Sequence, residues 1–382
     1  MMPSFKMSVL AGCLALSLAT LSGCSSTDNR YEPTPLSAIE DASLSPVQKW
    51  SVSLGGKADF GFAPTVVGGY VYAASTNGQV VKVDLNSGST LWSKKLDARL
   101  SAGVGADGRA VVVATHDGYV IALNDQGEEM WRAKAATEVN VPPVVGYGIA
   151  VVRTGDYRLQ AFDLRDGAVR WSVQRPGPAL ALKAASQMEI IDGLVFAGMP
   201  NGRMMAIDAE SGAVQWEETI AVSKGATDLE RIIDVVGAPQ FQGPIMCAAA
   251  YQGRIACFDL SQGGMPLWNQ NYSTKTGPAS DSRFLFVANE HDVLNAFTLQ
   301  DGINIWTQNA LKNRQLSPPT VITQALVVGD YAGVLHFLSR SDGRLLGRIN
   351  VGGGAMQSPL VGTSEGVVLQ TGNGNLLLVD AN

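Results

Sequence analysis

The stretch Asp84-Leu85-Asn86-Ser87-Gly88-Ser89-Thr90-Leu91-Trp92 decides the fold, because its frame of Asp, Gly and Trp at four-residue steps returns along the chain. Residues 163–171 (DLRDGAVRW) and 208–216 (DAESGAVQW) keep all three positions of this frame. The tryptophans follow one another at intervals of 38 to 52 residues: Trp50, Trp92, Trp131, Trp171, Trp216, Trp268 and Trp306. A repeat of roughly 40 residues built from short strands is typical of a β-propeller.

Each repeat is predicted to form four short antiparallel strands. Within residues 65–92, apolar runs alternate with turn residues at Gly68-Gly69, Thr76-Asn77-Gly78 and Asn86-Ser87-Gly88. Asn-Gly between apolar runs is a strong hairpin signal, because the tight turn needs a positive φ. The chain is therefore expected to be all-β.

The two ends of the repeat array predict how the ring closes. Residues 376–380 look like a third strand with no fourth after it, and residues 47–50 look like a fourth strand with no third before it. Pairing them completes one blade and hides two sheet edges that would otherwise invite aggregation. The 336 residues from 47 to 382 then divide into eight blades of 42.

Composition narrows the function classes. The 382 residues are 46% hydrophobic and only 16% charged, with 42 glycines and a net charge of −6, which excludes a coiled coil and a disordered chain. Without a long Lys/Arg run, a nucleic-acid partner is not expected. His116, His291 and His336 show no Cys/His clustering, so no metal site is expected. Residues 103–108 (GVGADG) and 362–366 (GTSEG) match nucleotide-binding and nucleophile patterns, but strand-like residues follow each, so both are interpreted as turns.

Residues 1–23 are expected to be a lipoprotein signal peptide. The apolar stretch 7–21 has 15 residues, fewer than the ~20 that span a bilayer. It runs into Leu21-Ser22-Gly23-Cys24, which resembles the lipobox of bacterial lipoproteins. The resemblance implies cleavage before Cys24 and acylation of that cysteine. The similar Leu10-Ala11-Gly12-Cys13 leaves too short an apolar stretch before it.

The segment after the lipobox predicts where the protein resides. Ser25 follows Cys24, and by resemblance to bacterial sorting rules this implies the outer membrane, with the chain facing the periplasm. Residues 24–46 are polar, contain three prolines and show no strong periodicity. We expect them to form a flexible tether between the acyl anchor and the propeller.

Two further cysteines flank a predicted turn. Cys247 and Cys257 lie symmetrically about Tyr251-Gln252-Gly253, so a hairpin with a three-residue loop places them opposite each other. Cβ separations of ~4.5–5.5 Å at such pairs exceed the disulfide mean, so a bridge needs local twist. The periplasm is oxidising. A structural disulfide and two buried free thiols are about equally supported.

The Asp/Gly/Trp frame resembles the PQQ-like propeller repeat, A-x-D-x-x-T-G-x-x-x-W, over essentially all of residues 47–382. The resemblance implies that each repeat tryptophan is a core residue between adjacent blades. It also raises an alternative function, a periplasmic PQQ-dependent quinoprotein dehydrogenase. Those enzymes are longer, carry a calcium-binding acidic site and often hold a vicinal Cys-Cys pair, and this chain has no adjacent cysteines. No catalysis and no cofactor are therefore expected.

The lipobox, short tether, eight repeats and total length resemble more closely the lipoprotein propellers of the outer-membrane β-barrel assembly machinery. Residues 178–183 (PALALK) resemble that family's L-x-L-R/K stretch, and residues 227–235 (TDLERIIDV) resemble its E-x-x-R-L-x-D-[VI]-D stretch. The family's second Asp falls on Val236 here, so that carboxylate is missing. In the family these segments contact the POTRA region of the central barrel-forming subunit.

The resemblance implies a non-catalytic scaffold that docks this subunit and aids the folding and insertion of β-barrel proteins. Both segments follow a repeat tryptophan, so they connect the outer strand of one blade to the inner strand of the next and emerge on one face. The residues expected to make the contact are Leu180, Leu182, Lys183, Glu230, Arg231 and Asp234.

Two further hypotheses concern these contact residues and the exposed edges of the blades. In one alternative, Leu180 and Leu182 begin an inner strand and belong to the core, while Glu230 and Arg231 form a solvated pair. A weaker hypothesis is that exposed blade edges capture unfolded outer-membrane protein clients by β-augmentation.

Overall fold

The computed structural model describes most of the chain from Tyr31 onward. The described residues are 31–381 without residues 60, 178–185, 223–225, 228–229 and 357. By compactness the chain divides into two units, Met1–Glu32 and Pro33–Asn382, and the described strands all belong to the second. The predicted signal peptide and Cys24 lie outside the described residues.

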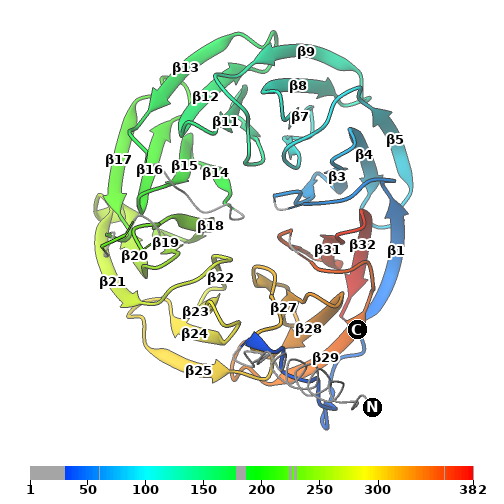
Figure 1. The fold of residues 1–382 in the computed structure, drawn as a ribbon, viewed down its shortest axis with the longest axis vertical. Helices are drawn as coiled ribbons and strands as arrows, with labels where there is room; N and C mark the ends of the chain where they lie inside the picture. Colours follow the sequence, from blue (N-terminus) through cyan, green and yellow to red (C-terminus); the bar gives the residue numbers. More distant parts are fainter. Residues whose placement is uncertain are drawn as a thin grey trace, which may run out of the picture. The chain divides into compact units, whose positions relative to one another are not determined.

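In the described residues of Pro33–Asn382, eight four-stranded antiparallel sheets form a closed ring (Figure 1). The first strand of each blade lies at the axis and the fourth at the rim, as Figure 1 shows for blades 3 and 4. The strands of blades 1 to 4 are β2 (Thr65–Val67), β3 (Tyr70–Ala74), β4 (Gln79–Asp84), β5 (Thr90–Lys95), β6 (Gly105–Ala106), β7 (Ala110–Ala114), β8 (Tyr119–Asn124), β9 (Glu129–Lys134), β10 (Val144–Gly146), β11 (Ile149–Arg153), β12 (Arg158–Asp163), β13 (Val169–Gln174), β14 (Met188–Ile191), β15 (Leu194–Met199), β16 (Arg203–Asp208) and β17 (Val214–Thr219).

The remaining four blades repeat this order, with a short 3₁₀ helix, η2 (Leu260–Gln262), between β20 and β21. Their strands are β18 (Val235–Gln242), β19 (Ile245–Ala250), β20 (Arg254–Asp259), β21 (Met265–Asn271), β22 (Pro278–Ser280), β23 (Phe284–Ala288), β24 (Leu294–Thr298), β25 (Asn304–Gln308), β26 (Thr320–Val321), β27 (Leu326–Gly329), β28 (Val334–Leu338), β29 (Leu345–Asn350), β30 (Val361–Thr363), β31 (Gly366–Gln370), β32 (Asn375–Asp380) and β1 (Val47–Ser53).

The eighth blade joins the two ends of the repeat array. Strand β1 pairs antiparallel with β32, which completes the sheet β1-β32-β31-β30. Lys49 Nζ lies 2.9 Å from the Asp380 carboxylate across this pair. The eight-bladed all-β fold and its closure by the terminal strands, both predicted from the repeats, are confirmed.

The core consists of apolar layers between neighbouring blades. The second and third strands are almost wholly buried, as in β7 and β8, whereas the outer strand β9 alternates between buried and exposed positions. One such layer joins Ala110 and Val112 of blade 2 to Ala150, Val152 and Phe162 of blade 3. Because two strands of each blade face neighbours on both sides, the sequence is rich in short apolar residues and poor in charge.

Each frame tryptophan packs against the frame glycine of the next blade. The φ of Gly212 is +75°, and a Cβ built on it would stand 2.6 Å from the Trp171 indole. The Trp171 indole N–H donates to the Ala209 carbonyl at 2.8 Å, and this hydrogen bond joins blade 3 to blade 4. Trp131 makes the same bond to Leu164. The glycine thus serves both the left-handed turn and the close approach of the indole.

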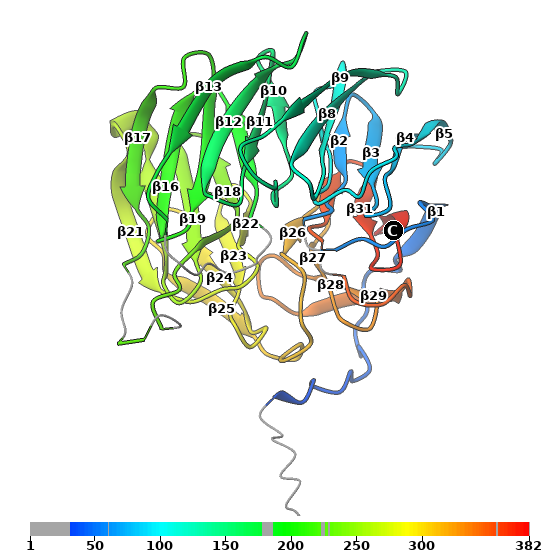
Figure 2. The ribbon, with the colours of Figure 1, turned by 45° about the horizontal axis from the view of Figure 1, so that its top comes forward.

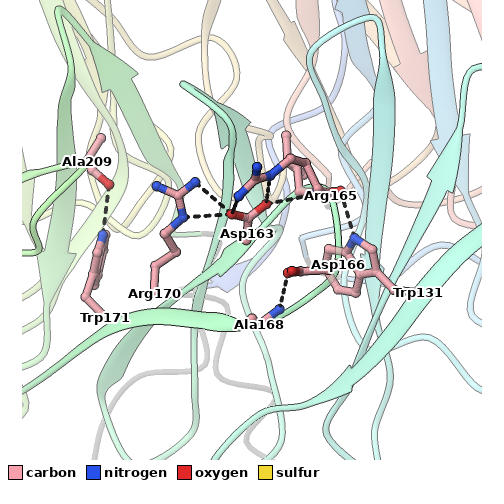
Figure 3. A network of polar contacts seen from close by, with 9 residues as sticks. Trp131, Asp163, Arg165, Asp166, Ala168, Arg170, Trp171 and Ala209 are labelled. Carbon is pink, nitrogen blue, oxygen red and sulfur yellow. Dashed lines mark hydrogen bonds and ion pairs between the residues drawn. The ribbon is translucent and has the colours of Figure 1, made fainter.

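The frame aspartate fastens the turn that carries this glycine. Figure 3 shows Asp163 bound by the guanidinium groups of Arg165 and Arg170, at 2.9 and 2.7 Å. Its carboxylate also accepts the Arg165 backbone N–H. These hydrogen bonds hold the pKa of Asp163 well below its usual range. Asp84 and Asp208 stabilise their own turns similarly, because their carboxylates accept the backbone N–H groups of Ser87 and Ser211, respectively.

Residues 33–46 depart from the flexible tether expected for this part of the chain. Thr34 donates its N–H to the Lys312 carbonyl, and Arg314 Nη1 donates to the Thr34 carbonyl at 2.9 Å. Further on, the N–H groups of Ser43 and Leu44 both donate to the Leu346 carbonyl. The segment therefore lies against blades 6 and 7. No sequence pattern indicates these contacts, because they are hydrogen bonds to and from backbone carbonyls between residues far apart in the chain.

Candidate functional site

The predicted partner-contact residues come from two consecutive connections between blades. The first connection, residues 175–187, joins β13 to β14, and the second, residues 220–234, joins β17 to β18. Both begin where an outer strand ends, and the outer strands β13 and β17, labelled in Figure 2, occupy the same position in consecutive blades. The described ends of the two connections therefore lie on one face of the ring, which we call the loop face. Leu180, Leu182 and Lys183 fall outside the described residues.

Glu230 organises the second connection from within. Its carboxylate accepts the N–H groups of Ala226 and Thr227, at 2.8 and 3.1 Å, while its own N–H donates to Thr227 Oγ1. This reciprocal pairing is the arrangement of a capping box. The backbone donors lower the pKa of the Glu230 carboxyl. Glu230 thus shapes the loop, a role that the sequence motif T-x-x-E could have indicated.

Asp234 lies at the base of the same connection and is buried, with 5% of its surface exposed. Its backbone forms an isolated bridge with Pro200 of blade 4, and its carbonyl accepts the Tyr251 N–H of blade 5. Val236, at the position of the family's second aspartate, is also buried. The structure therefore places Asp234 beneath the loop face, with its backbone joined to two blades.

The exposed part of the second connection includes one predicted residue and one that sequence reasoning missed. Arg231 is exposed. Val222 has 64% of its surface exposed, which is unusual for a Val in this chain. Exposed apolar and arginine side chains are both common in surfaces that bind a protein partner. Val222 follows Ile220 and Ala221, which are both buried. The sequence alone therefore does not show that the third residue of this apolar run is exposed while the first two belong to the core.

The two cysteines of blade 5 form a disulfide in the structure. Cys247 and Cys257 are direct partners in the β19–β20 register, with Cα atoms 4.1 Å apart and no exposed surface. The intervening loop has the three residues Tyr251, Gln252 and Gly253, as the sequence predicted. Of the two alternatives that the sequence left open, the geometry corresponds to the bridge.

A cavity of about 520 Å³ lies at the ring axis, lined mainly by the first strands of the blades. Glu189 is the one charged side chain among its described lining residues. Burial raises the pKa of Glu189 to about 7. The quinone cofactor of the alternative function carries carboxylates, which need cationic partners. The described lining offers none and therefore does not fit that group.

Within the described part of the chain, no three His, Cys, Asp or Glu side chains are grouped so that they could hold a metal ion. In that same part, no helix is long and apolar enough to cross a membrane.

Comparison with known proteins gives a consistent family of relatives. A family model described as outer membrane protein assembly factor BamB matches residues 47–101 and 76–308. The BamB of Bordetella pertussis is 52% identical over 377 residues, covering 98% of this chain and 96% of the relative. The BamB of Burkholderia pseudomallei is 35% identical, with 95% of each chain covered.

Solved structures share the fold. The crystal structure of BamB from Moraxella catarrhalis superposes with a TM-score of 0.81 at 24% identity, covering 88% of this chain and 100% of that one. The quinohemoprotein alcohol dehydrogenase of Comamonas testosteroni reaches 0.69 at 12% identity, covering 90% of this chain and 78% of that one. At such identities the likeness establishes the propeller alone.

Proposed function

Because this chain belongs to the family of the outer membrane protein assembly factor BamB, we propose that it is a non-catalytic scaffold of outer-membrane protein assembly. It docks the central barrel-forming subunit through that subunit's periplasmic POTRA region and so aids the folding and insertion of β-barrel proteins. Acylation of Cys24 anchors it to the outer membrane, where it faces the periplasm.

The observation that carries the docking proposal is that the described ends of two consecutive connections lie on the loop face. In the described part of the second connection, the Glu230 cap and the buried Asp234 lie on either side of Arg231 in the sequence, which supports this exposed residue as a contact. Leu180 and Leu182 are proposed as apolar anchors, with Lys183 and Arg231 as the charged rim. Contacts that order part of a binding segment in advance lower the entropy lost on binding, and charges at the rim of an interface tune its specificity.

Co-purification from membranes tests this assignment. A Leu182→Asp plus Arg231→Glu variant should fold but recover much less of the barrel-forming subunit than the wild-type chain. Tyr147→Asp plus Arg109→Glu is the matched control, because both residues are exposed in turns on the opposite face. Normal recovery with the folded loop-face variant would show that the site lies elsewhere.

A second candidate function is the capture of extended client segments at the rim. Leu91, Met130, Leu267 and Ile305 each precede a repeat tryptophan on an outer strand and have 40–48% of their surface exposed. An outer strand has one unpaired edge, to which another strand can add. A peptide with the sequence of a barrel strand should bind the purified chain, and N-methylation of its pairing edge should abolish binding. Equal binding of both peptides would refute this candidate.

A further inference from the structure

Residues 33–46, which we call the strap, cover the rim of blade 7. In each outer strand, one residue is bulged out of the pairing with the third strand, as Leu91 is in β5 and Leu346 in β29. Leu91 has 48% of its surface exposed, whereas Leu346 has 7%. The strap lies over Leu346, where the N–H groups of Ser43 and Leu44 donate to its carbonyl at 2.9 and 3.1 Å (Figure 1). It therefore covers a position that is open to solvent on blade 1.

Two leucines of the strap pack into the core of the ring. Leu36 packs against the layer between blades 6 and 7, which includes Trp306. Leu44 packs against the next layer, between blades 7 and 8, which includes Phe337. Both leucines are half-buried. Because burial of apolar surface is favourable, these contacts hold the strap on the ring across two consecutive blade junctions.

A buried arginine holds the first residues of the strap. Thr34 donates its N–H to the Lys312 carbonyl at 3.0 Å, and Arg314 Nη1 donates to the Thr34 carbonyl at 2.9 Å. The Arg314 guanidinium is itself fixed, because its Nε and Nη2 lie 2.8 and 2.7 Å from Oδ2 of Asp330, which has no exposed surface. His336 Nε2 lies 3.0 Å from the same oxygen. A donor fixed in this way gives Thr34 a defined place on the ring.

The two ends of the strap lie on opposite faces of the ring, because an outer strand begins on the face opposite to that on which it ends. Arg314 belongs to residues 309–319, which join β25 to β26, so Thr34 lies on the loop face. Val47 begins the outer strand β1 and pairs with Asp380, the last residue of β32, so it lies on the other face. The strap thus crosses the rim, and the chain reaches the ring on the loop face.

The strap also shortens the spacer between the ring and the proposed acyl anchor. Ten residue steps separate Cys24 from Thr34, and 23 separate it from Val47. A fully extended chain gains at most ~3.6 Å per residue, so the two spacers reach at most about 36 Å and about 83 Å. The longest described strand, β18, has eight residues and is ~27 Å long. The longer spacer would let either face of the ring turn to the lipid, whereas the shorter one is comparable with the thickness of the ring.

We propose that the strap orients the ring at the membrane. The anchor holds the propeller by its loop face, at the junction of blades 6 and 7, and this part of the ring lies nearest to the lipid. The described ends of the two docking connections belong to the same face, so the anchor and the partner contact share one face. This inference rests on the acylation of Cys24 proposed above and adds the point at which the anchor holds the ring.

Energy transfer from the protein to lipid headgroups measures this orientation. The full-length acylated protein is reconstituted in vesicles of phosphatidylethanolamine and phosphatidylglycerol that contain a headgroup-labelled acceptor lipid. A donor dye is attached in turn to Asn309→Cys on the loop face and to Gln300→Cys on the opposite face, both exposed positions of blade 6. Transfer should be stronger from Asn309→Cys. Equal transfer from the two positions, or stronger transfer from Gln300→Cys, would overturn the inference.

A variant that releases the strap tests its part in the orientation. Leu36→Asp plus Leu44→Asp replaces both apolar contacts by carboxylates, which resist burial. This variant should lose most of the difference in transfer, because its spacer grows to the longer one. Ser37→Asp plus Ser45→Asp is the matched control, since it adds the same charge at exposed strap positions and should keep the difference. Hydrogen exchange at the Thr34 and Leu44 N–H groups should become faster in the release variant alone.

The remaining outcomes separate the strap from the anchor. A release variant that keeps the wild-type difference in transfer would overturn the inference, as would unprotected exchange of the Thr34 N–H in the wild-type chain. If the release variant does not fold, Thr34→Pro, which removes one backbone donor, carries the test with the same expectation. A Cys24 that carries no acyl group in mass spectrometry of the membrane-purified protein would instead reject the anchor that belongs to the proposed function.

Discussion

The backbone carbonyl of Leu44 occupies the space in which a side chain at position 347 would stand. A Cβ built on Gly347 would lie 2.6 Å from that oxygen. Gly347 is the residue of the seventh repeat that takes the place of the frame tryptophan. At the seam where the ring closes, the N-terminal segment therefore covers the outer strand of blade 7 in place of an indole.

Gly347→Ala should destabilise the propeller by about 1–3 kcal/mol, because the added methyl meets backbone rather than a mobile side chain. Denaturant unfolding measures the loss, and hydrogen exchange should rise at Ser43 and Leu44, whose N–H groups bind the Leu346 carbonyl. The control is Gly146→Ala, where the nearest atom to the new methyl is 3.6 Å away. Equal stability of both variants would contradict the proposed seam.

The second prediction separates the two roles of the frame glycine. Gly68→Ala and Gly212→Ala both force a residue into positive φ, but only Gly212 has a neighbour within 4 Å, the Trp171 indole. Gly68→Ala should cost about 1–2 kcal/mol from the backbone alone. Gly212→Ala should cost about 1–3 kcal/mol more, since the indole must move. Similar losses in urea titrations would show that the indole contact adds nothing.

Cys247 and Cys257 of blade 5 are expected to be joined by a disulfide in the isolated protein. In unfolded protein isolated without reductant, peptide mapping should recover Cys247 and Cys257 as one cross-linked pair that alkylating agents do not label. Reduction should make both thiols reactive, which serves as the internal control. Replacing both by Ala should lower the free energy of unfolding by about 2–4 kcal/mol. Two labelled thiols before reduction would establish the free form.

The fourth prediction concerns pH. The folded chain keeps the proton on Glu189 up to about pH 7, whereas the unfolded chain loses it near 4.5. Between these values the folded state binds more protons, so this group's contribution to stability falls as pH rises and then levels off above pH 7. Glu189→Gln should therefore melt higher than the wild type at pH 8, by on the order of 1–3 °C, and nearly alike at pH 4.5.

In thermal melts from pH 4.5 to pH 8, the melting temperature of Glu189→Gln should rise relative to that of the wild type as the pH increases. Glu210→Gln, an exposed carboxylate in the same blade, should show no such trend. A constant difference across the range would mean that Glu189 is not the group responsible.

Much of the architecture follows from local chemistry. The recurring aspartate and glycine specify the same turn in each repeat, and the alternating apolar strands around it can bury their surfaces only against copies of themselves. The site was less predictable. Glu230 and Asp234 look alike in sequence as charged loop residues, yet one caps its own loop and the other is buried with its backbone bonded to blades 4 and 5.

The sequence by itself determined the number of blades, the strand order and the pairing of β1 with β32, because each depends on spacing and on turns of a few residues. Only the tertiary structure decided that Leu44 covers Gly347, that residues 33–46 lie on the ring, and that Asp234 is buried with its backbone bonded to blades 4 and 5. These contacts join residues far apart in the chain through backbone carbonyls and a buried charge. Such partners leave no periodic signal, since their meeting depends on how neighbouring blades pack.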